Sequence, residues 1–532
     1  MHQNTRKTLK NTDEELKDLH SIWETMNARK NALIERCEQY AVWTVPSVCP
    51  QEEESESEQT KGNVAIGARL VNHLANRIVD TMFPSDRPFF SLPLTPEAEN
   101  KLSEELEEEE KNKYLRDIKK VTAAIEDTAM RKLNLTSYRP IAVQAVQHLI
   151  ITGNAVIHRT EDDMRTVYGV KDSSVTRDVK GRLVNCMLRD SRMFGTLSTE
   201  MQERLTEDGK KEYKQEDPVT VYTYYYLDRT TKKWTRLQGI DTIVLMNTKK
   251  TYAKVDLPIL SLTWNLSRGE NYGRGLVEDH SVTFHNIDVT TLAMIDLINI
   301  AADVKFLVNP ASTMDVVEWN EAERGAYLPG RPDDITTPQF PKRLEIDIMS
   351  SAIQRWEQEL AQSFLLNSSG VRDAERVTAE EIRFVARELE SAFGGLYSAL
   401  ALGWQHREAT YLISKVNFSV EGPNGTKNFD VVVTTGLESL SREGQLDNLR
   451  AAIGDLQLMD AVPEDLRNVM DRRAFAEFVF TNRGMKIGQF ILTQEQIEQQ
   501  QRAAQQAQQA QQQAEGAQQV AVAAGQAASQ EG

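Results

Sequence analysis

Apolar residues at spacings of three and four predict helices along most of the N-terminal part of the chain. Asn63 has the side chain expected of an N-cap for the second helix. Phe83–Pro84 ends that helix and Gly153–Asn154 follows the last one, because proline and glycine both interrupt helices. The expected helices cover residues 14–42, 63–82, 112–133 and 140–151.

The hydrophobic pattern changes to a period of two after residue 154. Short alternating runs, with a turn at Lys180–Gly181, are typical of strands. An antiparallel β-rich segment inside a mainly helical chain indicates an α+β fold. The expected strands cover residues 155–158, 167–170, 175–178, 183–189, 219–228, 233–237 and 242–246.

Two long helices are predicted beyond a glycine-rich loop at residues 267–275. The first covers residues 276–304, the second covers 345–366, and each shows a single apolar stripe. Residues 305–344 separate them and are rich in turn-forming Pro and Gly. The stripe residues expected to pack are Phe284, Ile287, Thr291, Met294, Ile298 and Ala301 in the first helix and Met349, Ile353, Trp356, Leu360 and Phe364 in the second.

A third helix begins with a capping box, in which Thr378 caps the helix and Glu381 reaches back. Gly394–Gly395 lies within this helix and predicts a kink. One more strand is expected at residues 429–434 and further helices at 439–477. The tail at 494–532 contains 16 Gln and 11 Ala, a low-complexity composition.

The composition is that of a globular protein, since 40% of the 532 residues are hydrophobic and 27% are charged. No run reaches the ~18 apolar residues of a membrane span, and the N-terminus lacks the apolar segment of a signal peptide. Cys37, Cys49 and Cys186 are widely spaced, which argues against a disulfide framework or a CxxC zinc site. We therefore expect a chain suited to a reducing cytoplasm, with no membrane association.

The net charge of −17 argues against tight, static binding of nucleic acid, which usually requires a basic excess. An acidic surface can nevertheless let DNA pass, because it repels phosphates. Residues 276–350 hold 13 Asp or Glu and only 5 Lys or Arg. This segment is either a solvated helical hairpin or an acidic surface that faces a molecule to which it must not bind.

The sequence contains no recognisable catalytic motif. Residues 325–331 resemble a P-loop without its lysine, and Pro332 cannot donate an amide to phosphate. The Gly273-x-Gly sequence lacks the third glycine of a dinucleotide site. His280 and His285 diverge by about 140° on a helix, and neither HExxH nor GxSxG occurs. We predict no catalytic residue, cofactor or metal; an α+β enzyme without a recognisable motif, or another structural or scaffold protein, remains the alternative.

Several longer motifs are more informative than any single site. The most specific is ERVTAEEIRFVARELE followed by GG-x-YS, within residues 364–401. With it occur VWTVPS at 42–47, IGARLVNHLANRIVDTMFP at 66–84, SYRPIAVQAVQHLIITGNA at 137–155, GENYGRGLVED at 269–279, LVNPAS at 307–312, GRPDDI at 330–335 and TTGLESLSREGQLDNL at 434–449. In these motifs, which extend over residues 15–495, the chain resembles the portal (head-to-tail connector) proteins of short-tailed, autographivirus-like bacteriophages.

The resemblance implies a dodecameric ring around a central channel at one vertex of the capsid. It also implies a division of the chain into named parts. These are a wing at residues 1–265, a first stem helix at 266–304, a clip at 305–344, a second stem helix at 345–366, a tunnel loop at 367–377, a kinked helix that returns to the wing at 378–438, crown helices at 439–493 and the low-complexity tail at 494–532.

The resemblance further implies a structural role in the virion, with assembly in the host cytoplasm. The ring would nucleate head assembly and conduct double-stranded DNA during packaging and ejection, with energy supplied by a separate motor. The expected partners are the scaffolding protein, the major capsid protein, the terminase large subunit, the tail adaptor and the internal core proteins.

The implied tunnel loop carries two cations on a loose backbone. Gly370 and the neighbouring Ser368 and Ser369 favour flexibility, while Arg372 and Arg376 could contact DNA phosphates in the channel. The alternative is that both arginines pair with Asp373, Glu375 or a neighbouring subunit.

Overall fold

The computed structural model describes residues 18–51, 62–85, 87–92, 108–207, 213–228, 231–302, 307–311, 315–328, 331, 334–336, 343–366, 379–416 and 434–435, with short pieces at 454–455, 474–476 and 478–479. The chain divides into two compact units, Met1–Ser439 and Leu440–Gly532. The described pieces of the second unit are helical. The helices predicted at 439–477 and the tail at 494–532 fall almost entirely outside the described residues.

The N-terminal part of the first unit is helical, as predicted. Two helices replace the one expected over residues 14–42, because a 3-10 turn at Ala28–Lys30 interrupts it. The N-cap prediction is wrong, since the third helix begins at Gly67 and Asn63 instead donates two hydrogen bonds to the carboxylate of Asp288. The helices are α1 (Leu19–Asn27), α2 (Asn31–Trp43), α3 (Gly67–Met82), α5 (Glu108–Leu135) and α6 (Tyr138–Thr152).

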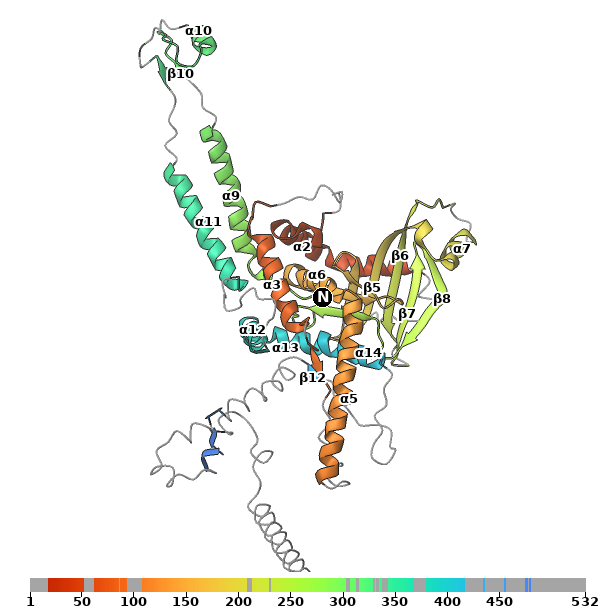
Figure 1. Ribbon diagram of the computed structural model, residues 1–532. Coiled ribbons are helices and arrows are strands. Elements are labelled where there is room, and N and C mark those ends of the chain that lie inside the picture. The colour runs from red at the N-terminus through yellow and green to blue at the C-terminus, as the bar shows by residue number, and fades with distance from the viewer. Residues whose placement is uncertain are drawn as a thin grey trace, which may run out of the picture. The chain divides into compact units, whose positions relative to one another are not determined.

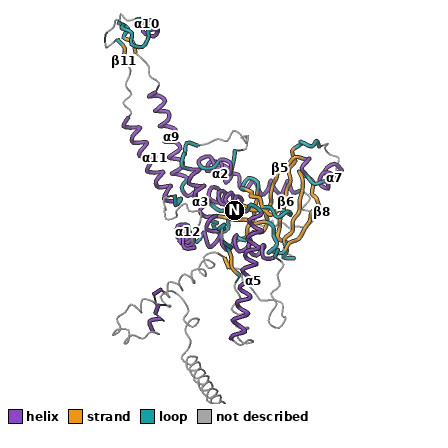
Figure 2. Tube along the Cα trace, in the orientation of Figure 1, coloured by secondary structure: helices purple, strands orange, loops and turns teal. Residues whose placement is uncertain are grey.

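Among the described residues, antiparallel strands form a three-stranded sheet, a five-stranded sheet and two pairs of short strands. Together with the helices they confirm the α+β class (Figure 2). The three-stranded sheet has the order β3-β2-β9 and the five-stranded sheet the order β4-β5-β6-β7-β8. All seven strands predicted between residues 155 and 246 are present, and in this part of the chain β9 and the helix α7 (Thr199–Glu207) are additional. The strands are β2 (Asn154–Arg159), β3 (Arg165–Tyr168), β4 (Ser173–Arg177), β5 (Leu183–Met193), β6 (Pro218–Leu227), β7 (Trp234–Ile240), β8 (Ile243–Tyr252) and β9 (Ile259–Thr263).

The five-stranded sheet is covered on both faces, because alternate residues of each strand point to opposite sides. On one face, Tyr222, Tyr224 and Tyr226 of β6 pack against Leu19 and Trp23 of α1. On the other face, Cys186, Tyr225 and Trp234 belong to a cluster that also includes residues of β2, β3 and β9. This region therefore contains its own apolar core.

A pair of long helices, α9 and α11, lies side by side and is joined by a small β-containing segment (Figure 1). The first predicted helix is interrupted at His280, where α8 ends before α9 begins. The second begins two residues earlier and ends three residues earlier than predicted. The elements are α8 (Leu276–Asp279), α9 (Ser281–Ala302), β10 (Leu307–Val308), α10 (Val316–Glu321), β11 (Ile335–Thr336) and α11 (Arg343–Ser363).

Short helices complete the first unit. Two strands far apart in sequence, β1 (Phe90–Ser91) and β12 (Thr434–Thr435), pair with each other. Thr378 of the predicted capping box lies outside the described residues, as does most of the strand predicted at 429–434. The helices are α12 (Ala379–Ala392), α13 (Leu396–Leu400) and α14 (His406–Ser414), with a π-helical turn at Ala401–Gln405 before the last.

Candidate functional site at the base of the helical pair

The base of the pair is the best-packed part of the two long helices. Phe284 of α9 and Phe364, directly after α11, are both fully buried, with their rings edge to face and their centroids 6.0 Å apart. Trp43 of α2 stacks on Phe284 from the other side, with centroids 6.3 Å apart. Leu360 is also fully buried. These aromatic contacts attach the pair to the N-terminal helices.

Burial decreases along the pair away from this base. Of the predicted packing residues, Leu360 and Phe364 are fully buried, whereas Ile353 and Trp356 are only partly buried. The expectation of one apolar stripe on the first helix is wrong, because α9 is apolar on more than one face. Its exposed apolar residues are Val282, Val289, Leu292, Ile295, Ile298 and Ile300, with exposed fractions between 40% and 71%.

Two acidic residues of the helical segment face the body of the first unit. Asp288 of α9 accepts hydrogen bonds from the indole N–H of Trp43, at 3.2 Å, and from the backbone and side-chain amides of Asn63. Glu278 of α8 forms an ion pair with Arg36 of α2, with Nη1 and Oε1 3.1 Å apart. The acidic excess counted from the sequence therefore overstates the charge available to an outside surface.

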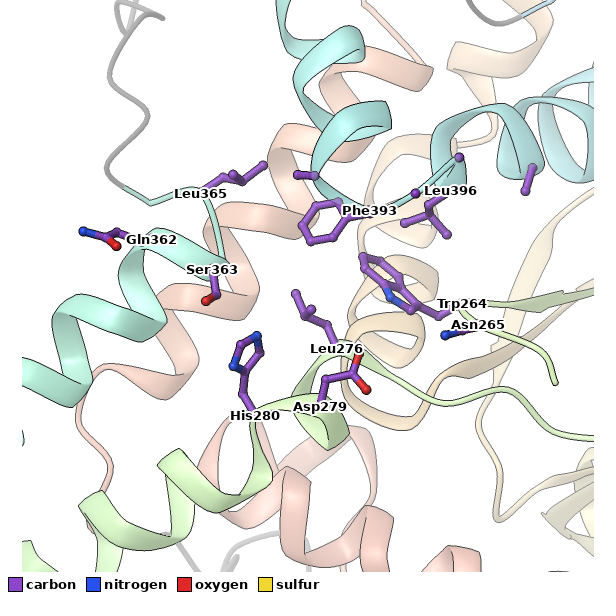
Figure 3. Close-up of a pocket in the computed structure, with 14 residues that line it drawn as sticks. Trp264, Asn265, Leu276, Asp279, His280, Gln362, Ser363, Leu365, Phe393 and Leu396 are labelled. Atoms are coloured by element: carbon purple, nitrogen blue, oxygen red, sulfur yellow. The ribbon is translucent and has the colours of Figure 1, made fainter.

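A cavity of about 590 Å³ opens beside this base, between the ends of α8, α11 and α12 (Figure 3). Its wall combines the aromatic pair Trp264 and Phe393, whose ring centroids are 5.3 Å apart, with polar side chains. The polar lining residues include Asn265, Asp279, His280, Gln362 and Ser363. Among the described residues, no three His, Cys, Asp or Glu side chains are grouped to hold a metal ion.

The predicted glycine pair lies at the edge of this cavity. Helix α12 ends at Ala392, and α13 begins after Gly394 and Gly395. Both glycines have positive φ, 57° and 90°, a conformation that residues with a Cβ adopt at a cost. The interruption is thus a turn between two helices rather than a bend within one.

Leu365 occupies the position where a helix commonly ends in glycine. Its φ is +56°, and the N–H of Leu366 donates to the carbonyl of Ala361, as in a Schellman motif. A leucine in this conformation costs about 1 kcal/mol. The carbonyl of Leu365 accepts a hydrogen bond from the Arg77 guanidinium of α3, which also pairs with Glu388 of α12 at 2.5 Å.

Arg77 therefore ties the end of α11 to α12, on either side of residues 367–378. The predicted tunnel-loop residues Ser368, Ser369, Gly370, Arg372 and Arg376 all lie in that segment, outside the described residues. Sequence reasoning missed Arg77, Asp288 and Leu365, because their partners lie far along the chain or their backbone conformation leaves no mark in the hydrophobic pattern.

No helix in the described part of the chain has both the length and the apolar character needed to cross a membrane. The candidate site consists of a packed aromatic base, a polar-rimmed cavity and two left-handed turns, one at Leu365 after α11 and one at Gly394–Gly395 after α12.

The chain matches a family model described as "Bacteriophage head to tail connecting protein" over residues 16–407. The "Portal protein" of Enterobacteria phage SP6 is 29% identical over 487 residues, covering 90% of each chain. The "Portal protein" of Escherichia phage T7 is 27% identical over 490 residues, covering 90% of this chain and 89% of the relative.

Solved structures also match. A chain from the "Virion of native gene transfer agent (GTA) particle" is 12% identical, with a TM-score of 0.32, and the match covers 73% of this chain and 85% of that one. A chain from the "Neck of empty GTA particle computed with C6 symmetry" is 12% identical, with a TM-score of 0.34, covering 74% and 86%.

Proposed function

The chain belongs to the family of bacteriophage head to tail connecting proteins, and from this premise we propose that it is a portal protein whose copies form a dodecameric ring at one capsid vertex. The channel of the ring conducts double-stranded DNA during packaging and ejection. The family is a structural one, so energy for DNA movement is expected from a separate terminase rather than from this chain.

The observation that carries the ring is the apolar surface of α9. A single chain leaves six of its large aliphatic residues, from Val282 to Ile300, at least 40% exposed. So many exposed aliphatic side chains on one helix indicate an interface. A second copy that places its own helical pair against this face would bury it, and repetition around an axis closes a ring.

The exposed carboxylates of α9 and α11 support a role of these helices in the wall of the channel. Asp296 of α9 is exposed, as are Glu345, Asp347 and Glu359 of α11. In a ring, these carboxylates repeat around the axis and repel the phosphates of DNA, which keeps the duplex from adhering to the wall.

Residues 367–377 are proposed as the tunnel loop, with Arg372 and Arg376 contacting phosphates. Support comes from the two flanks, since Arg77 fixes Leu365 on one side and Glu388 on the other. Pairing of these arginines with Asp373, Glu375 or a neighbouring subunit remains the alternative.

The segment between the long helices is proposed as the clip, where the terminase large subunit and then the tail adaptor dock. Trp319 is 48% exposed and Tyr327 fully exposed, and aromatic residues of this kind are favoured at interfaces. Scaffolding protein, major capsid protein and internal core proteins are the further proposed partners, with assembly in the host cytoplasm.

The ring is tested by the mass and shape of the purified protein without ATP or metal. Twelve chains of 60.3 kDa make about 720 kDa, and electron microscopy should show rings with a central hole. A stable monomer at micromolar concentration over a range of salt would contradict the proposal.

The tunnel loop is tested by the double variant Arg372→Ala/Arg376→Ala. We expect rings to form normally, while packaging efficiency or genome retention in vitro changes at low salt and the change shrinks as salt screens phosphate contacts. The matched control is Arg29→Ala/Arg131→Ala, which removes the same charge from two exposed helical positions. Loss of rings in the loop variant would instead assign these arginines to the subunit interface.

A further inference from the structure

A second cavity, of about 540 Å³, lies far from the helical pair in sequence, among residues of the two sheets and α14. Strand β2 contributes His158 and Arg159, β7 contributes Arg236, and Tyr411 of α14 closes another side. The volume is typical of a small-molecule site.

The sheet face behind this cavity has an unusual pattern. Val221 and Ile240 belong to one apolar cluster at one end of the face, and Tyr225 and Trp234 belong to another. Between them, the cross-strand pair Thr223 and Gln238 is hydrogen bonded, with Nε2 and Oγ1 3.2 Å apart.

Arg236 extends this polar band and is only 8% exposed. Burying an arginine on a sheet face is costly. Apolar residues of similar volume usually stabilise a fold at least as well as a buried charged group does, so this polar band is a candidate for a role in binding.

The cavity wall is cationic in a chain of net charge −17. Its charged lining residues are Arg159, Arg192, Arg236 and Lys415 against Glu161 and Asp256. Burial lowers the pKa of His158 to about 4, so its ring is neutral at pH 7 and adds no charge. Arg192 is paired with Asp190, with Nη2 and Oδ2 3.0 Å apart. With that carboxylate included, the wall carries a net charge of about +1 at pH 7.

Two of the arginines are available to an anion. The guanidinium of Arg159 lies over the Tyr411 ring, 3.2 Å from its centroid, and donates to the carbonyl of Asp256. Among the described residues it forms no ion pair with a carboxylate. Arg236 and Lys250 share the single carboxylate of Glu161, at 3.0 and 2.6 Å.

The Glu161 side chain is 66% exposed, so its pairs are weak and a stronger anion can displace it. The Glu161 carboxylate therefore occupies the position beside the Arg236 guanidinium that a ligand phosphate would take.

We infer that this cavity binds a phosphate monoester attached to a planar ring, a ligand of the nucleotide class. Guanidinium groups match phosphate oxygens in pairs, and Arg159 and Arg236 supply two of them. Tyr252, a partly buried residue of the wall, offers an aromatic face to a base. The inference goes beyond the proposed channel, which requires no such site.

The test is calorimetric titration of the full-length protein with deoxyadenosine 5′-monophosphate. We expect saturable binding of one nucleotide per chain, weakened by added salt. Inorganic phosphate should compete weakly, and deoxyadenosine without the phosphate should bind at least about tenfold more weakly, because its charge-assisted hydrogen bonds are lost. Equal binding of deoxyadenosine, or no saturable binding of the nucleotide, would overturn the inference.

Two variants of opposite expected effect test the site itself. Arg236→Gln should weaken nucleotide binding about tenfold or more, and Glu161→Gln should strengthen it severalfold by removing the competing carboxylate. Tighter binding in Glu161→Gln cannot result from misfolding. Lys415→Gln, at an exposed position, should weaken binding with an unchanged melting temperature. Arg182→Gln, on a distant exposed turn, is the control and should bind as the wild type does.

A 5′-phosphorylated trinucleotide and its unphosphorylated counterpart identify the source of the phosphate. Competition by the phosphorylated form alone assigns the ligand to a DNA strand end. Competition by neither assigns it to free nucleotides. Equal affinity of the Arg236→Gln, Glu161→Gln and control variants would show that nucleotide binds elsewhere.

Discussion

The five-stranded sheet and the α9/α11 pair differ in how far they bury their apolar residues. In the sheet, Cys186, Tyr224 and Tyr225 are at most 1% exposed, and every residue that covers them belongs to the same chain. In the pair, Phe284 and Phe364 are equally buried at the base, but the aliphatic residues farther along α9 face outward.

If the proposed ring is correct, this difference separates the apolar surface that the chain buries by itself from the surface that a neighbouring copy buries. Apolar burial is the main stabilising contribution to folding, so the sheet and the base of the pair should hold in an isolated chain. The exposed face of α9 stabilises nothing until a partner covers it. Stability and assembly should therefore respond to substitutions in different regions.

The largest effect is expected from Leu292→Glu/Ile298→Glu on the exposed face of α9. Covering each aliphatic side chain contributes about 1.5–3 kcal/mol, and two unpaired carboxylates would have to be buried in every interface. We expect rings to be lost, as measured by mass photometry, while the sheet unfolds at an unchanged denaturant concentration.

Its control is Val179→Glu/Met246→Glu, which places the same charges at exposed apolar positions in the sheet region. Rings should persist in this variant. Intact rings in the α9 variant would mean that this face is not the interface, and the comparison between the two regions would fail.

Phe364→Ala should be the most damaging single substitution at the base. Truncating a buried phenylalanine typically costs about 3–5 kcal/mol, and here it removes the contacts with Phe284 and His280. Trp356→Ala, at a partly buried position in the same helix, should cost less in the isolated chain. Chemical denaturation of dissociated protein measures both. Equal losses would show that burial along the pair does not decline from base to tip.

The sequence predicted much of this arrangement. Spacing alone placed Leu360 and Phe364 on a packing face, and period-two alternation located seven strands, because both patterns report which side of an element is covered. The glycine pair Gly394–Gly395 was predicted to kink a helix, whereas the structure has a turn between α12 and α13, and the positive φ values explain why glycine is needed there.

What the sequence could not provide are partners and exceptions to local rules. Asp288 was counted as part of an acidic surface, yet it accepts a hydrogen bond from Trp43, 245 positions away. Leu365 adopts a conformation typical of glycine. Helix α9 carries apolar residues on several faces, and in the proposed ring a neighbouring copy covers some of them. The spacing of apolar residues cannot show which of them are buried by the same chain and which by another.

The sheet region contains a buried lysine, Lys30, and the titration of this lysine should make the stability of the fold depend on pH. Lys30 is 1% exposed, and burial, with Arg189 nearby, lowers its pKa from 10.5 to about 7. The unfolded chain then binds more protons than the folded one between about pH 7 and 10. The unfolding free energy attributable to Lys30 should rise with pH over that window, by up to about 1.4 kcal/mol per pH unit.

Lys30→Met should abolish this contribution, and Lys120→Met, at a position whose side chain is 80% exposed, should not. The measurement is the difference in unfolding free energy between wild type and variant at each pH. Burial raises the pKa of Cys49 and Cys186 to about 12, and both thiols interact electrostatically with Lys30. The comparison is therefore made below about pH 8.5, where the thiols of the unfolded chain also stay protonated. A pH-independent difference would show that Lys30 stays charged in the fold.

The smallest expected effects come from two glycines that flank α13, between the helical pair and the body of the first unit. Gly395→Ala forces a residue with a Cβ into φ +90° and should lower the unfolding free energy by about 1–2 kcal/mol. Gly403→Ala, in the helical turn after α13, places a Cβ where no atom lies within 4 Å, and should raise stability by about 0.5–1 kcal/mol. The same substitution thus has opposite signs eight residues apart, and denaturant midpoints of dissociated protein measure both. If Gly395→Ala also leaves rings intact, the turn supports the self-sufficient region. If rings are lost while the unfolding free energy is unchanged, the turn at Gly395 instead sets the angle at which the α9/α11 pair contacts the neighbouring copy. The part of the chain needed for assembly would then extend beyond α9 to the turn between α12 and α13.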